Sequence, residues 1–257
     1  MSKADPTGAD IAEKAPLILK KKALGETANM AVLAIAAGAF IAFGSIGSFV
    51  AEASGGGPVL GGLVFSVGLI LVMVAGTQLF TGNTMMVLPD LEGRLNTSLV
   101  LYGWVTVWLG NLVGSLAIVV LFIAAGGGDA LDGAVGQAAV DTASSKAAKG
   151  SWAIIASAIL ANMLVCLAVW MSMATKSVAG RILAIIGPIT IFVASGFEHS
   201  IANMSILPIG WAMGDGAFSV LDMTHNILLA TVGNIIGGIL VALVLSGGHG
   251  TIERVDE

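Results

Sequence analysis

The chain has 257 residues, of which 56% are hydrophobic and only 11% are charged, and its mean hydropathy is +0.96. About a quarter of the residues in a soluble domain are charged, so this composition excludes an ordinary soluble domain and predicts a membrane protein. The formal charge of −5 comes mostly from the termini and loops, and we expect no nucleic-acid partner.

The first 26 residues are polar, contain Lys14 and Lys20–Lys22, and lack the apolar core of a secretory signal. We expect 1–26 to be a cytoplasmic N-terminal segment. Residues 27–247 are predicted to form a single pore domain, and 248–257 a cytoplasmic tail. The one cysteine, Cys166, lies in an apolar run and is expected to be a packing residue.

Six membrane spans are predicted from the apolar runs, because about 20 helical residues cross a hydrocarbon core of about 30 Å. The predicted spans are 27–51, 58–80, 95–125, 151–175, 181–197 and 218–245. We expect the Gly/Ala-rich stretch 126–150 to be an external loop. The fold class is therefore an all-α membrane protein with six transmembrane helices.

The second and fifth helices are predicted to be broken. Residues 53–89 carry no charge over 37 residues, which is about 55 Å of helix and too long for one straight span. The polar group at 81–83 interrupts this run, and the group at 198–200 interrupts the fifth span. Each break is followed by a short half-helix, ending near residues 91 and 211.

The chain also contains a duplication. The phrases Gly110–Ser115 and Gly233–Gly238 are nearly identical, Asn111 and Asn234 are 123 residues apart, and Asn83 and Asn203 are 120 apart. Three spans in each half is an odd number, so the halves must enter the membrane in opposite orientations as inverted repeats. The Gly-x-x-x-Gly spacing in both phrases is typical of close helix packing.

The basic residues orient the protein, because cytoplasmic segments are enriched in Lys and Arg. With a cytoplasmic N-terminus, nine of the 11 basic residues fall on the cytoplasmic side and only Lys146 and Lys149 fall outside. The nine are Lys3, Lys14, Lys20, Lys21, Lys22, Arg94, Lys176, Arg181 and Arg254. Both termini are therefore predicted to be cytoplasmic.

An opened backbone at membrane depth is tolerated only where it is buried in protein or lines a water-filled cavity. The two breaks should meet near the midplane, where half-helix N-termini suit an anion. His199 can donate a hydrogen bond or a proton there. Glu198 is expected to orient it or to anchor the helix. Asn83 and Asn203 are expected to satisfy opened backbone, and Thr81 either lines the pore or caps a half-helix.

These residues together resemble the bacterial formate/nitrite transporter family. The resemblance rests on Phe80-Thr81, the two Gly-Asn phrases, the stretch 161–170 and, above all, Ala194-Ser-Gly-Phe-Glu-His-Ser-Ile-Ala-Asn-Met204. It implies an aquaporin-like protomer in a homopentamer in the bacterial inner membrane. Each protomer would hold one pore for small monovalent anions or their acids, and lipid would surround the assembly.

The resemblance also assigns residues. It implies pore positions at Thr81, Asn162, Glu198, His199 and Asn226, a vestibule lysine at Lys146 with Lys149 as the competing assignment, and apolar constrictions at Phe65, Leu69, Leu79, Phe80 and Phe192. Lys146 would concentrate the anion. A proton from water or from His199 would then let the neutral acid cross the constrictions; in a competing version, protonated His199 stabilises the charged anion.

Nitrite or formate is the expected solute, with a slight preference for nitrite from Thr81-Gly82-Asn83-Thr84-Met85. A hydrosulfide channel of the same family is an alternative. From another class, an aquaporin-like neutral-solute channel remains, although the chain has no paired Asn-Pro-Ala phrases. We expect no enzyme activity, catalytic residue, cofactor or metal, because the chain has neither metal-ligand spacing nor a phosphate-binding loop.

Overall fold

The computed structural model describes residues 5–214 and 216–251, and all regular structure within these residues is helical. The elements in chain order are α1 (Gly8–Ala23), α2 (Thr27–Ala53), α3 (Gly57–Ala75), α4 (Phe80–Asn83), η1 (Thr84–Met86), α5 (Val87–Leu91), α6 (Thr97–Ala124), η2 (Gly127–Asp129), α7 (Ala134–Ala147), α8 (Ser151–Ser172), α9 (Val178–Ala194), α10 (Ser200–Met213) and α11 (Val220–Gly248). The predicted all-α class is confirmed. Lys3, Arg254 and most of the predicted tail lie outside the described residues.

Within the described residues, five helices are long and apolar enough to cross a membrane, namely α2, α3, α6, α8 and α11. The apolar helix α9 is shorter; it corresponds to the fifth predicted span and brings the number of spans to six. The second span ends at Ala75 rather than near residue 80, because Gly76 takes a left-handed conformation with φ 71° and closes the helix. Gly196, with φ 65°, follows the end of the fifth span in the same way.

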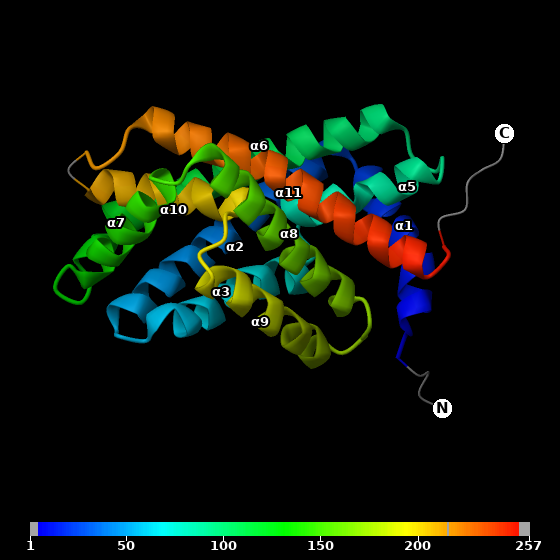
Figure 1. The fold of residues 1–257 in the computed structure, drawn as a ribbon, viewed down its shortest axis with the longest axis horizontal. Helices are drawn as coiled ribbons and strands as arrows, with labels where there is room; N and C mark the ends of the chain where they lie inside the picture. Colours follow the sequence, from blue (N-terminus) through cyan, green and yellow to red (C-terminus); the bar gives the residue numbers. More distant parts are fainter. Residues whose placement is uncertain (1–4, 215, 252–257) are drawn as a thin grey trace.

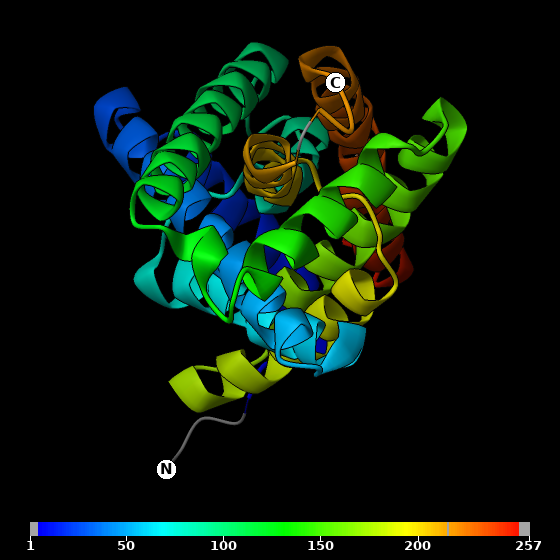
Figure 2. The ribbon, with the colours of Figure 1, turned by 90° about the vertical axis from the view of Figure 1, so that its left-hand side faces the viewer.

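The predicted breaks in the second and fifth helices are present. Residues 76–79 separate α3 from α4, and residues 195–199 separate α9 from α10. The half-helices differ: α10 runs for 14 residues, whereas the first one is divided into α4, η1 and α5. Figure 2, seen from the α7 end, shows α10 near the centre with longer helices around it.

Corresponding helices of the two halves make corresponding contacts. Helix α2 packs along α6, α8 packs along α11, and α3 meets α9 between the halves. Glycine makes these approaches possible: a Cβ at Gly114 would collide with the carbonyl oxygen of Ile35, and one at Gly237 with that of Ile159. The structure therefore has the predicted architecture of two inverted three-span repeats.

The prediction of an external loop at 126–150 is wrong over residues 134–147, where α7 forms. This helix buries Val135, Ala139 and Ala143 against α10, a contact that its low hydropathy does not reveal. Helix α1 is its counterpart in the first half and packs on α5 and η1. Figure 1 places α1 at one end of the long axis and α7 at the other.

The outer surface of the helix assembly is apolar. Large side chains are exposed along the spans, including Val32, Val59, Val105, Leu121, Leu183 and Val244. The interior, in contrast, holds many buried polar residues near the two breaks. Apolar outside and polar inside is the pattern expected of a multi-pass membrane protein with a functional interior.

Candidate functional site

The last helix of each half carries one asparagine whose side chain hydrogen-bonds the backbone groups that the break leaves without partners. Asn111 Oδ1 accepts the Phe80 N–H at 2.9 Å, while its Nδ2 donates to the carbonyl oxygens of Ala34 at 2.7 Å and Gln78 at 2.9 Å. The amide therefore joins α2, the break and α4 to α6.

Asn234 repeats this arrangement in the second half. Its Oδ1 accepts the Ser200 N–H at 2.8 Å, and its Nδ2 donates to the carbonyl oxygens of Ala158 at 2.8 Å and Glu198 at 3.1 Å. The Gly-Asn phrases thus hold the breaks open in addition to packing helices. Sequence reasoning gave this role to Asn83 and Asn203, whose amides instead donate to the side chains of Gln78 and Glu198.

The two halves meet at His199 and Thr81. His199 is the N-cap of α10, and its Nδ1 accepts the Ala202 N–H at 3.1 Å. Its Nε2 lies 2.9 Å from Thr81 Oγ1 in the first half-helix. Since Nδ1 accepts, a neutral ring carries its proton on Nε2 and donates it to Thr81. The prediction that both breaks come together around this imidazole is confirmed.

Thr81 caps no helix through its hydroxyl, because the N-cap of α4 is Leu79 and makes no side-chain cap bond. Its oxygen accepts from His199, and the hydroxyl hydrogen has no acceptor among the hydrogen bonds of the described residues. Both side chains are almost completely buried.

Aromatic rings cover one side of His199. The Phe192 ring centroid lies 5.6 Å from that of the imidazole, and Phe65 meets Phe192 edge-on at 5.5 Å with an interplanar angle of 89°. Leu79 and Phe80 directly precede Thr81 in sequence. All five predicted constriction residues belong to one buried apolar cluster, namely Phe65, Leu69, Leu79, Phe80 and Phe192.

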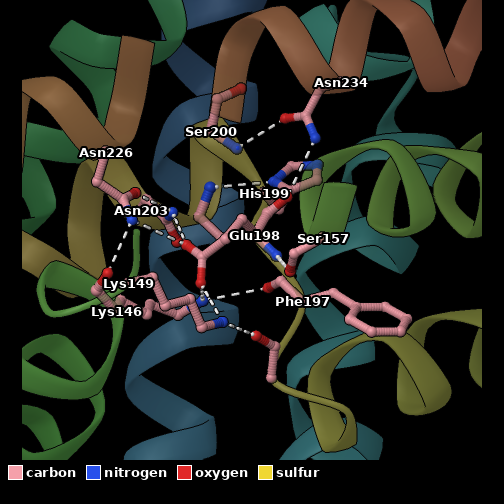
Figure 3. Close-up of polar contacts among 12 residues, drawn as sticks. Lys146, Lys149, Ser157, Phe197, Glu198, His199, Ser200, Asn203, Asn226 and Asn234 are labelled. Carbon is pink, nitrogen blue, oxygen red and sulfur yellow. Dashed lines mark hydrogen bonds and ion pairs between the residues drawn. The ribbon is translucent and has the colours of Figure 1, made fainter. Parts of the chain in front are cut away.

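Glu198 anchors a charged network rather than orienting His199 (Figure 3). Lys146 Nζ lies 3.3 Å and Lys149 Nζ 2.6 Å from Glu198 Oε1, and Oε2 accepts from Asn203 at 2.6 Å and Asn226 at 3.3 Å. Lys146 also donates to the Phe197 carbonyl at 3.1 Å. The network fastens α7 and α11 to the second break.

The two predicted asparagines occupy different places. Asn226 lies within the Glu198 network, where its Nδ2 donates to the Lys146 carbonyl at 3.0 Å. Asn162 lies beside the first half-helix, with its Nδ2 directed at the carbonyl oxygen of Thr81 at 3.2 Å and at Thr84 Oγ1 at 3.0 Å. The buried Oδ1 of Asn162 has no hydrogen-bond partner among the described residues.

Repeat symmetry identifies a further residue that sequence reasoning missed. Lys22 and Lys146 are 124 residues apart, the same separation as Ala34 and Ala158. The Lys22 carbonyl accepts from Gln78, as the Lys146 carbonyl accepts from Asn226 in the Glu198 network. The signal was present in the sequence, but the alignment of α1 with α7 becomes visible only when both are folded.

Cavities open toward each end of this site. The cavity at the α7 end, which we call the outer cavity, has a volume of about 430 Å³ and is lined by Lys146 and Lys149. The cavity at the α1 end, of about 330 Å³, is lined by four basic residues and reaches Gly82 beside Thr81. The basic residues are Lys14, Lys22, Lys176 and Arg181. Within the described residues, no group of three His, Cys, Asp or Glu side chains is placed to hold a metal ion.

Comparisons with known proteins agree with this geometry. The formate channel FocA of Escherichia coli strain K12 is 37% identical over 237 residues, which cover 82% of this chain and 83% of FocA. The nitrite transporter NirC of Salmonella typhimurium is 35% identical over 191 residues, covering 71% of this chain and 68% of NirC. Both relatives are transport proteins, not enzymes.

Solved structures give the same result. A pentameric formate channel with formate bound superposes with a TM-score of 0.76 at 30% identity, covering 83% of this chain and 93% of that one. An ion channel of the FNT family superposes with a TM-score of 0.80 at 30% identity, covering 90% of this chain and 95% of that one. The family model for formate/nitrite transporters matches residues 9–247. The chain is therefore a member of the formate/nitrite transporter family.

Proposed function

We propose that this chain forms a homopentamer in the bacterial inner membrane and that each protomer conducts formate or nitrite. The names of the relatives support both solutes, since identity to FocA and to NirC is similar. The pentameric neighbour supports the assembly. The distribution of basic residues supports cytoplasmic termini, with 27–247 as the pore domain between the segments 1–26 and 248–257.

The observation that carries the proposal is the His199–Thr81 hydrogen bond at the junction of the two breaks. A protonated imidazole would place an N–H on Nδ1 facing the Ala202 N–H, and the cap of α10 would be lost. The geometry therefore favours a neutral ring that positions the Thr81 hydroxyl as a donor to the solute. This supports passage of the neutral acid over the version with a protonated His199.

The surroundings support the same path. A bare anion is strongly disfavoured in an apolar constriction that cannot replace its water. Lys146 draws the anion into the outer cavity, and the neutral acid then passes Phe65 and Phe192 to reach Thr81. On the cytoplasmic side the solute leaves beside Gly82 into the cavity lined by Lys22, where it ionises again.

Uptake by the purified protein in liposomes tests the proposal. We expect labelled formate and labelled nitrite both to enter, at rates well above those of empty liposomes, with little added water permeability. Hydrosulfide entry faster than either anion would instead favour the hydrosulfide alternative. Rapid water flux without anion entry would favour the aquaporin-like alternative and contradict the proposal.

A further inference from the structure

A carboxylate that the pore mechanism does not use lies at the external mouth. Glu52 is in the last turn of α2, is partly buried, and lines three neighbouring hollows of that end. An acidic side chain on the way into an anion path needs a reason, because it repels the solute that Lys146 attracts.

Glu52 lies where two hollows of this entrance adjoin. The outer cavity of about 430 Å³ and a deeper hollow of about 60 Å³ share five lining residues, Glu52, Thr142, Lys146, Val193 and Gly196. We call these five residues the neck. The deeper hollow ends on Phe65 and Phe192. A solute moving inward therefore passes Glu52 just before the aromatic constriction.

No cation is committed to Glu52 among the residues that the structure describes. Lys146 and Lys149 form their ion pairs with Glu198, and Glu52 is in no ion pair. The other charged group on the facing helix is Asp141, a carboxylate that lines the adjacent groove. On α3, the residues nearest to Glu52 are Pro58 and Gly61, which carry no charge.

One of the two hydroxyl partners of Glu52 suits a protonated carboxyl group. Ser48 Oγ lies 3.3 Å from Oε1 and Thr142 Oγ1 lies 3.4 Å from Oε2. Thr142 has one hydroxyl hydrogen, and its shorter contact, 2.8 Å to the Ala138 carbonyl, takes it. The Thr142 oxygen is then left as an acceptor, to which a protonated Glu52 can donate.

We propose that Glu52 delivers the proton that converts the incoming anion into its neutral acid. The O–H bond of the Glu52 carboxyl breaks as an O–H bond to the formate or nitrite oxygen forms, which leaves a Glu52 carboxylate and a neutral acid. A proton from external water restores Glu52. The step needs no oxidant or reductant.

The physical reason is the repulsion between two negative groups in a narrow, partly dehydrated neck. One proton shared between Glu52 and the solute removes that repulsion, as it does between paired carboxylates. Lys146 holds the anion in place while the proton moves. The neutral acid then enters the aromatic constriction, and the remaining Glu52 carboxylate disfavours entry of a second anion until it is protonated again.

This inference rests on the proposed function and is tested by Glu52→Gln, which keeps the side-chain shape but cannot deliver a proton. We expect formate-driven acidification inside liposomes to slow about tenfold at neutral pH, less than a positioned general acid can contribute because water remains a competing donor. The deficit should shrink as the external pH falls. Asp141→Asn, which removes a nearby carboxylate outside the neck, is the matched control and should behave as wild type.

A second variant, Glu52→His, keeps a titratable group that changes charge at higher pH, and it should move the pH profile of transport toward higher pH. If Glu52→Gln matches or exceeds the wild-type rate at every pH, or if Glu52→His leaves the profile unmoved, the inference is wrong while the proposed function stands. If the wild-type protein admits neither formate nor nitrite, both are wrong.

Discussion

Asn111→Ala and Asn234→Ala are each expected to destabilise the protein severely, to the point that little assembled protein is recovered from membranes. Each substitution leaves one backbone N–H and one carbonyl group at a break without their partner, and it also removes the hydrogen bond from the amide to a carbonyl of the neighbouring helix, α2 or α8. A buried unsatisfied polar group costs about 1–3 kcal/mol. The free energy of unfolding should therefore fall by about 3–6 kcal/mol where water cannot fully replace the amide. Thermal unfolding of the purified protein in detergent measures it.

Ser115→Ala is the matched control for the first of these. Ser115 lies one turn further along α6, is also buried, and its Oγ makes one hydrogen bond across to the same partner helix, to the Gly38 carbonyl at 3.2 Å. Loss of this hydrogen bond should lower the free energy of unfolding by about 1 kcal/mol and leave assembly intact. Equal stabilities of Asn111→Ala and Ser115→Ala would show that the amide does not hold the break.

His199→Asn is expected to slow transport about fivefold to tenfold while the fold is retained. Asparagine is a good N-cap, so its side-chain oxygen can still accept the Ala202 N–H, but it is too short to reach Thr81. The substitution removes one neutral hydrogen bond, worth about 1 kcal/mol, between the two half-helices. Formate and nitrite uptake into liposomes measures the effect.

Thr81→Val is the complementary variant, because it removes the hydroxyl that the imidazole positions. Both variants should lose rate by similar factors, and both should keep the wild-type pH dependence, since protons come from outside the gap. A pH dependence abolished by His199→Asn would favour the protonated-His199 version. Wild-type rate and pH dependence in His199→Asn would remove the central residue from either version.

The sequence was sufficient for the parts of the fold that depend on local composition. Long charge-free runs define the spans, and a polar group in a run too long for one span defines each break. The predicted helix ends were less accurate. The second span ends at Ala75, five residues before the predicted end, because the left-handed conformation of Gly76 closes the helix.

The parts that sequence missed depend on contacts between distant segments. Asn111 and Asn234 looked like packing residues, because their backbone partners lie 31 and 34 residues away and only the folded break shows which groups need satisfying. Helix α7 has weak hydropathy and forms against α10. The approach of His199 to Thr81, 118 residues apart, followed from the two breaks meeting.

We expect formate to cross the gap between the two breaks as the neutral acid. Liposomes that contain the protein, a pH-sensitive dye and a voltage-sensitive dye test it directly when an inward formate gradient is applied. We expect internal acidification in step with formate entry and no change in membrane potential. Formate entry that builds an inside-negative potential without acidification would show that the bare anion crosses and that the neutral acid is not the transported species.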